Sequence, residues 1–150
     1  MRRVWRNTLD PAGISLTVVR EGGPRLACAS PSEGARLFME SQPQDGREHF
    51  RAAFLDTRHR LIGPVYVVSI GCMTASLVHP RELFRPAIAA GAAGVVLSHN
   101  HPSGDPEPSA EDIALTRRLV AAGTVLGIEV LDHLITGEGR YVSLKERGVL

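Results

Sequence analysis

The sequence predicts a single α/β (α+β) domain in which helices alternate with the strands of one mixed sheet. The chain has 150 residues, of which 43% are hydrophobic and 22% are charged, a balance typical of one globular domain with one core. Short alternating or apolar runs predict strands, and helix starts or turns separate each run from the next. The net charge of +1 gives no bulk attraction to nucleic acid or to membrane surfaces.

The first 29 residues predict an N-terminal extension that contains a β-hairpin, and residues 30–150 predict the main domain. The predicted hairpin has a strand at residues 14–20, a turn at 22–24 and a return strand at 25–29. The main domain is predicted to begin with a helix, because Ser30 suits the N-cap, Pro31 the first helical position and Glu33 the third position of a capping box.

Local patterns predict the remaining elements of the main domain. Strands are predicted, in order, at residues 48–56, 61–70, 94–99, 128–136 and 140–144. Further helices are predicted to begin at His79 and at Ser109. Proline and glycine modify these elements: Pro64 indicates a sheet edge or a bulge, Pro86 predicts a kink, and Gly123 predicts the end of the last helix.

The segment from Ser98 to Asp112 contains the residues that predict a chemical function. His99 and His101 are two positions apart at the end of a predicted strand, so both imidazoles project to the same side. Asp112 lies in the first turn of the helix that begins at Ser109. Two neutral imidazoles and one carboxylate can form a three-ligand zinc site with a fourth position for water, the arrangement of a catalytic site. The spacing of Ser109 and Asp112 is also typical of an ordinary helix cap, which needs no metal.

The same segment resembles the JAMM motif of JAB/MPN metallopeptidases. The matching pattern is His-x-His-Pro, six residues, Ser, two residues and Asp, with a glutamate far upstream at the start of a strand. From about Ser30 to Leu150 the chain also resembles the RadC family of bacterial proteins. The blocks that carry this resemblance are residues 48–50, 54–57, 79–82, 99–112, 131–133 and 140–144. The resemblance implies a mixed, curved β-sheet flanked by helices, related to the cytidine deaminase fold.

The resemblance also implies a role for each residue of the motif. His99, His101 and Asp112 are expected to bind one zinc ion per chain. Glu48 is expected to polarise the metal-bound water and to carry its proton to the leaving amine, and the Ser109 hydroxyl to stabilise the tetrahedral oxyanion. The implied function is that of a zinc metallopeptidase or isopeptidase. Its expected substrate is a peptide or an isopeptide-linked protein tail, for which a ubiquitin-like protein is a candidate.

A DNA-repair-associated or scaffold module of the RadC family, which binds zinc without peptidase turnover, is the alternative interpretation. Direct binding of nucleic acid is not expected, because the net charge is weak and the first thirty residues contain no helix-hairpin-helix. No signal peptide, membrane span or Cys-x-x-Cys pair is recognisable, so we expect a cytoplasmic protein without membrane contacts. The signature of zinc nucleobase deaminases is absent. His133 is interpreted as a buried core histidine, with a hydrogen bond near the metal as the less favoured alternative.

Overall fold

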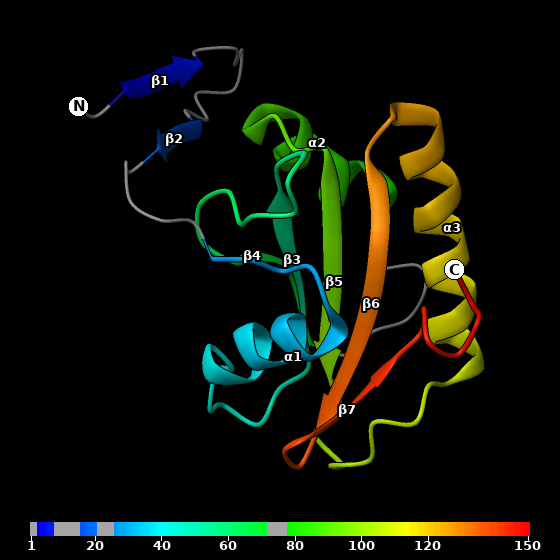
Figure 1. The fold of residues 1–150 in the computed structure, drawn as a ribbon. Helices are drawn as coiled ribbons and strands as arrows, with labels where there is room; N and C mark the ends of the chain where they lie inside the picture. The colour runs from blue at the N-terminus through cyan, green and yellow to red at the C-terminus, as the bar shows by residue number, and fades with distance from the viewer. Residues whose placement is uncertain (1–2, 8–15, 21–25, 72–77) are drawn as a thin grey trace.

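The computed structural model describes residues 3–7, 16–20, 26–71 and 78–150 (Figure 1). Its elements are, in chain order, β1 (Arg3–Asn7), β2 (Leu16–Arg20), α1 (Pro31–Glu40), β3 (His49–Leu55), β4 (Tyr66–Ile70), α2 (Pro80–Ala90), β5 (Gly94–Asn100), α3 (Ala110–Leu126), β6 (Glu129–Gly137) and β7 (Arg140–Ser143). A five-stranded sheet has the order β4-β3-β5-β6-β7, and β1 pairs with β2 in a second sheet. In the larger sheet β5 and β6 are parallel, and the other neighbouring strands are antiparallel. The predicted fold class is confirmed.

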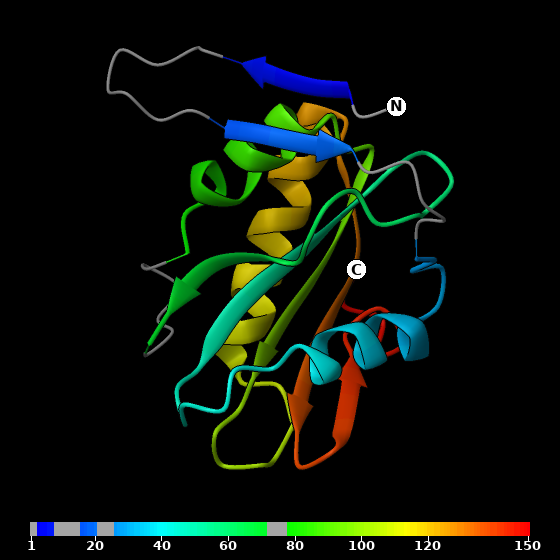
Figure 2. The same cartoon turned by 90° about the vertical axis from the view of Figure 1, so that its left-hand side faces the viewer.

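Helices cover both faces of the five-stranded sheet (Figures 1 and 2). Helix α1 packs on one face, where it contacts β6, and helices α2 and α3 pack on the other, where they contact β3 and β6 respectively. Each face has its own apolar core. The core beneath α2 and α3 contains Phe50, Ala52, Phe54, Val78, Leu83, Phe84, Ala87, Val95, Leu97, Leu115, Leu119, Ile128 and Val130. The core beneath α1 contains Cys28, Ala35, Phe38, Ala53, Leu55, Val96 and Leu134.

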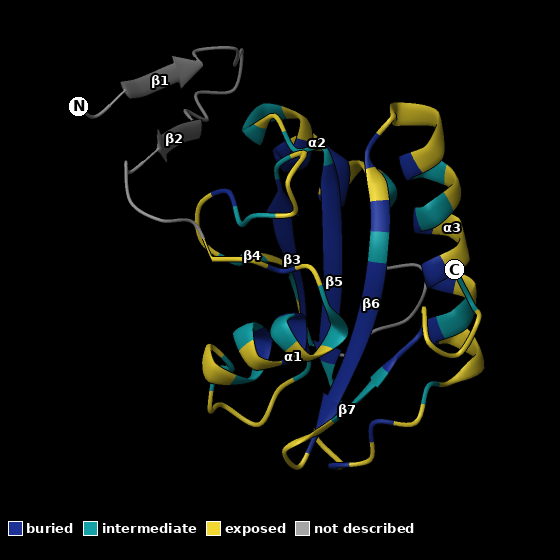
Figure 3. Cartoon of the chain, in the orientation of Figure 1, coloured by how far each residue is buried: buried dark blue, intermediate teal, exposed yellow. Residues whose placement is uncertain are grey.

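The central strands are buried on both of their faces, as Figure 3 shows for β3 and β5. Every residue of β3 is buried, including the charged Arg51. The Arg51 guanidinium donates to the carbonyl oxygens of Phe38 at 2.7 Å and Ser41 at 3.0 Å, which lie at the end of α1. Burial lowers the pKa of Arg51 to about 10, and the side chain joins α1 to the sheet by satisfying carbonyls that the helix leaves open.

The three helices of the described residues begin as predicted, and the N-cap of α2 is His79. In α1, Ser30 is the N-cap and forms a capping box with Glu33, and Pro31 occupies the first helical position. Helix α3 begins after Ser109, which is its N-cap. Helix α2 continues through Pro86 to Ala90, and the kink stays a prediction. Among the helices of the described residues, none combines the length and the apolar character needed to cross a membrane.

The predicted end of the last helix at Gly123 is wrong. Helix α3 continues to Leu126 and ends at Gly127, whose φ of 70° is the left-handed conformation of a helix C-cap. Gly123 is a buried helical residue instead. A Cβ atom at this position would lie 2.4 Å from the carbonyl oxygen of Ile128 and 3.2 Å from the ring of Phe84. This glycine therefore permits close packing and does not terminate the helix.

The predicted strand at residues 61–70 is also too long. Gly63, with a φ of 70°, and Pro64, which has no amide hydrogen, interrupt it. Leu61 forms only an isolated bridge with Leu55, and β4 begins at Tyr66. The strand is the edge strand that Pro64 indicated. It also contains a bulge, because the pairs Phe50↔Ser69 and Arg51↔Val67 skip Val68 of β4.

The N-terminal extension pairs differently from the predicted hairpin. Residues 16–20 form β2, and their partner is β1 at residues 3–7. The predicted return strand at 25–29 is not formed in its described part, where Ala27 makes an isolated bridge with Arg60. The predicted turn at residues 22–24 lies outside the described residues. The division at residue 30 stays a prediction.

Candidate metal centre

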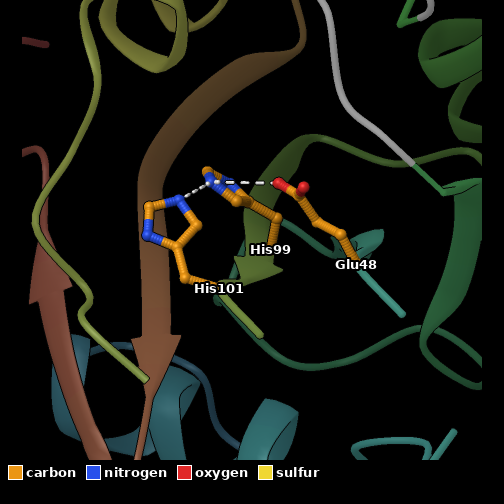
Figure 4. A group of neighbouring side chains, drawn as sticks. All are labelled: Glu48, His99 and His101. Carbon is orange, nitrogen blue, oxygen red and sulfur yellow. Dashed lines mark hydrogen bonds and ion pairs between the residues drawn. The ribbon is translucent and has the colours of Figure 1, made fainter. Parts of the chain in front are cut away.

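The candidate site lies where the parallel strands β5 and β6 end. His99 is the penultimate residue of β5. His101 follows this strand, and its amide donates to the carbonyl oxygen of Thr136 in β6 at 2.8 Å. The two imidazoles meet on one side of the sheet, as predicted, with their Nε2 atoms 3.0 Å apart. Glu48 immediately precedes β3 and approaches His99 from the side opposite His101 (Figure 4).

Asp112 reaches the same place from the first turn of α3. Its Oδ1 atom lies 3.2 Å from Nε2 of His99, and its Oδ2 atom lies 3.4 Å from Nε2 of His101. Burial opposes ionisation of this carboxyl, but the neighbouring His99 and the hydrogen bonding with Ser109 hold the pKa of Asp112 below its ordinary value. Oε1 of Glu48 lies 3.8 Å from Nε2 of His99. The structure thus brings four of the five predicted site residues into one cluster.

The cluster has dimensions that suit a metal ion. Tetrahedral ligands about 2.0 to 2.1 Å from zinc are about 3.3 Å from one another. The two Nε2 atoms are 3.0 Å apart, and the two oxygens of Asp112 lie 3.2 Å from His99 and 3.4 Å from His101 respectively. Two nitrogens with one carboxylate oxygen are a donor set that zinc accepts. The ligand atoms of Glu48, His99 and His101 also lie within 4.8 Å of one another. These residues could therefore hold a metal ion, with Glu48 close enough to contact the ion or a group beside it.

Asn100, between the two histidines, fixes the position of the segment that carries Glu48. Its Oδ1 atom accepts from the amide of His49 at 2.8 Å, and its Nδ2 atom donates to the carbonyl oxygen of Arg47 at 2.9 Å. These bonds hold the backbone on both sides of Glu48. The motif alone predicts no role for Asn100, although its place between the two histidines is a usable signal.

Two glycines position the loop that joins His101 to α3. Gly104 has a φ of 88°, a conformation that favours glycine. At Gly137, the end of β6, a Cβ atom would lie 2.5 Å from the carbonyl oxygen of Gly104. The loop therefore rests directly on the turn between β6 and β7. Nδ1 of His101 lies 2.7 Å from the carbonyl oxygen of Asp105 in this loop, and because a carbonyl can only accept, this nitrogen carries a hydrogen and donates it.

Ser109 forms the predicted cap of α3. Its hydroxyl accepts from the amide of Asp112 at 3.1 Å, and its own amide donates to Oδ2 of Asp112 at 2.8 Å. This capping box fixes the direction of the aspartate. Because the hydroxyl accepts with a lone pair, its own hydrogen remains for donation, so the capping role does not exclude the predicted oxyanion role of Ser109. That role stays a prediction.

His133 lies next to the cluster, which favours the less preferred alternative, a hydrogen bond near the metal. Its Nε2 atom is 2.8 Å from Nδ1 of His99, and its Nδ1 atom is 2.6 Å from the hydroxyl of Thr116. The ring is fully buried, and burial followed by the charge of His99 lowers the pKa of His133 well below its ordinary value. Thr116 was not identified from the sequence, although it lies four positions after Asp112, on the same face of a helix.

The fold and the cluster define a mixed-sheet domain with a candidate metal centre at the ends of its parallel strands. The chain belongs to the RadC-like JAB domain family, whose model matches residues 28–149. This membership confirms the resemblance described above, and the match covers β3 to β7 together with Glu48, the histidines and Asp112.

Relatives of known sequence carry a family name without a stated activity. A UPF0758 protein of Desulfitobacterium hafniense (strain DSM 10664 / DCB-2) is 53% identical over 121 residues, covering 81% of this chain and 53% of that protein. UPF0758 proteins of Moorella thermoacetica and Methanococcoides burtonii are 51% and 56% identical, covering 84% and 85% of this chain and 55% of each relative. The chain thus spans about half the length of these relatives.

Proposed function

We propose that this chain is a zinc-dependent amide hydrolase of the JAMM type. His99, His101 and Asp112 hold one zinc ion, Glu48 acts as general acid and base, and Ser109 stabilises the oxyanion. The observation that carries the proposal is the convergence of two imidazole nitrogens and a carboxylate, 3.0 to 3.4 Å apart, beside a second carboxylate. A cytoplasmic location accompanies the proposal as a prediction of the sequence.

Each residue has a part in the proposed reaction. Zinc, when bound, lowers the pKa of water toward about 7 and polarises the scissile carbonyl. Glu48, 20% exposed at its side chain, accepts the proton of the attacking water and returns it to the leaving amine. Ser109 donates its hydroxyl hydrogen to the oxygen on which negative charge develops. Phe50 stacks on the ring of His99 with centroids 6.0 Å apart, which keeps water away from the inner side of that ligand.

The proposed substrate is a peptide or an isopeptide-linked protein tail, with a ubiquitin-like protein as a candidate. An extended chain can be bound by pairing with the free edge of a sheet. Within the described part of the chain, β4 pairs only with β3 and so offers an edge. The end of this strand is close to Glu48, because the amide of Gly71, just after β4, donates to the carbonyl oxygen of Glu48 at 2.9 Å.

The test compares zinc-loaded protein with its Glu48→Gln variant on tail-fused peptides, isopeptide conjugates, and single- and double-stranded DNA. The variant should bind zinc and fold like the parent but lose amide hydrolysis, because glutamine cannot accept the proton. Glu129→Gln is the matched control, since Glu129 is exposed at the start of β6, the end of the strand far from the site. It should retain full activity.

Three outcomes would contradict the proposal. Absence of zinc from the native protein, with none taken up when zinc is added, would refute the metal site. Equal rates of hydrolysis by the parent and by Glu48→Gln would refute the role of Glu48 as general acid and base. Glu48-dependent cleavage of DNA with every amide substrate intact would replace the peptidase by a nuclease associated with DNA repair.

A further inference from the structure

A one-residue shift in strand pairing brings His133 to His99. Strand β6 pairs with β5 at Val95↔Val130 and then at Val96↔Asp132, so the register shifts between these pairs. Such a bulge reverses which side chains face each side of the sheet from that point on. Val130 lies in the core beneath α2 and α3, and Leu134 lies in the core beneath α1. Without the shift, His133 would face α1, away from the cluster.

His133 lies within a chain of buried hydrogen bonds that links two of the proposed ligands. Nδ1 of His99 lies 2.8 Å from Nε2 of His133, and Nδ1 of His133 lies 2.6 Å from the Thr116 hydroxyl. The Thr116 hydroxyl donates to the backbone carbonyl oxygen of Asp112 at 2.6 Å. The ring of Phe50 packs edge-on against His133, with centroids 5.3 Å apart, so the rings have little freedom to turn.

The carbonyl of Asp112 determines where every hydrogen in this chain lies. A carbonyl oxygen only accepts, so the single hydrogen of the Thr116 hydroxyl is used there. The hydroxyl must then accept from Nδ1 of His133. A neutral His133 with a hydrogen on Nδ1 has a bare Nε2, which accepts from Nδ1 of His99. A neutral His99 is then left with a bare Nε2, the atom that faces His101 and Asp112.

The two facing imidazoles consequently have no hydrogen between them. His101 already donates its Nδ1 hydrogen to the carbonyl oxygen of Asp105, so its Nε2 atom is bare as well when the ring is neutral. Two bare nitrogens 3.0 Å apart repel each other unless a cation lies between them and the carboxylate of Asp112.

We propose that Thr116 and His133 are positioning residues that hold His99 in its metal-binding tautomer before any metal arrives. The inference rests on the metal site of the proposed function but not on amide hydrolysis. A histidine ligand is oriented by the partner of its second nitrogen, and loss of such a partner weakens metal binding about 10- to 100-fold. Here the partner is tied back to the helix turn that supplies the third ligand, so one network aligns His99 and Asp112 together.

The test uses Thr116→Val, which removes the hydroxyl and keeps the branched shape. Thr124→Val is the matched control, because Thr124 lies on the same helix and donates in the same way to the carbonyl oxygen of Val120, but is exposed. Thr116→Ser should restore the hydroxyl. One measurement is the tautomer of His99 in metal-free, ¹⁵N-labelled protein at mildly alkaline pH, read by long-range ¹H–¹⁵N correlation. The other is zinc affinity in competition with a chelator.

We expect the parent and Thr124→Val to carry the His99 hydrogen on Nδ1, and Thr116→Val to show the other tautomer or a mixture. Zinc affinity should fall tenfold or more in Thr116→Val and recover in Thr116→Ser. A hydrogen on Nε2 of His99 in the metal-free parent would overturn the proposal, even if a variant fails to fold. Unchanged tautomer and affinity in folded Thr116→Val would also overturn it. Zinc binding with the expected tautomer but without amide cleavage would leave the positioning pair intact and refute only the hydrolase.

Discussion

Replacing Asn100 by alanine removes the two hydrogen bonds that join the end of β5 to the backbone around Glu48. The acceptor of the His49 amide at 2.8 Å and the donor to the Arg47 carbonyl at 2.9 Å are both lost. Each such bond contributes about 1 kcal/mol net, so the free energy of unfolding should fall by about 2 kcal/mol. At a urea dependence of about 2 kcal/mol per molar, the unfolding midpoint should fall by about 1 M.

The measurement is urea unfolding of metal-free protein, followed by zinc affinity and hydrolysis per folded molecule. Gln44→Ala is the control, because Gln44 is an exposed amide side chain whose Nε2 donates locally, to the carbonyl oxygen of Gln42 at 3.1 Å. Its unfolding midpoint should stay close to that of the parent. Zinc affinity of Asn100→Ala should change little, while Glu48-dependent hydrolysis should fall at least tenfold. An unchanged midpoint in Asn100→Ala would refute the reasoning, because the two bonds would then not restrain this segment.

Three further predictions address the helix caps and the buried thiol. Ser109→Ala should lower the free energy of unfolding by about 1 kcal/mol, because it removes a helix cap. Ser109→Asn should retain the cap but lower kcat about a hundredfold, because it removes the hydroxyl that stabilises the oxyanion. A fully active Ser109→Asn would show that the serine is only a cap. Arg51→Met should lower the free energy of unfolding by about 3 kcal/mol, measured with urea, because it leaves buried carbonyls of α1 unpaired. Burial, with the charges of Glu33 and Asp132, raises the pKa of the Cys28 thiol to about 11. In a Cys72→Ser protein, alkylation of Cys28 at neutral pH should therefore be about a hundredfold slower in the folded than in the unfolded state, and equal rates would contradict its burial.

The features that the sequence predicted correctly depend on short-range rules. Ser30 and Ser109 cap helices because each hydroxyl accepts from the amide three residues later, which the first helical turn leaves without a partner. His99 and His101 meet because residues two apart in a strand share a side. Gly123 shows where such rules fail: glycine is compatible with a helix end, but only the packing of Phe84 and Ile128 around it reveals that close approach is its purpose here.

The position of His133 could not be obtained from any local pattern. The side of the sheet that His133 faces depends on the register shift between the pairs of Val95 and Val96. The alternation of residues 128–136 does not indicate a bulge. Counting continuously from Val130 puts His133 on the α1 face, where a histidine is simply a core residue. The interpretation as a core histidine was reasonable for the pattern, and the tertiary pairing of β5 with β6 reverses it.

Backbone carbonyl groups, more than the other ligands, orient the histidines of the proposed centre. A sequence motif without these groups would not form a working metal site. His101 is oriented by the carbonyl of Asp105, whose loop approaches β6 only because Gly137 has no side chain. His99 is oriented through His133 and Thr116 by the carbonyl of Asp112. Consider a chain with the same two histidines and aspartate but without the bulge in β6. Nδ1 of its first histidine would have no such acceptor, so the ring could place its hydrogen on Nε2 instead. Such a chain would match the motif and still bind zinc weakly, so the residue that accepts from the first histidine is a better indicator of a metal centre than the spacing alone.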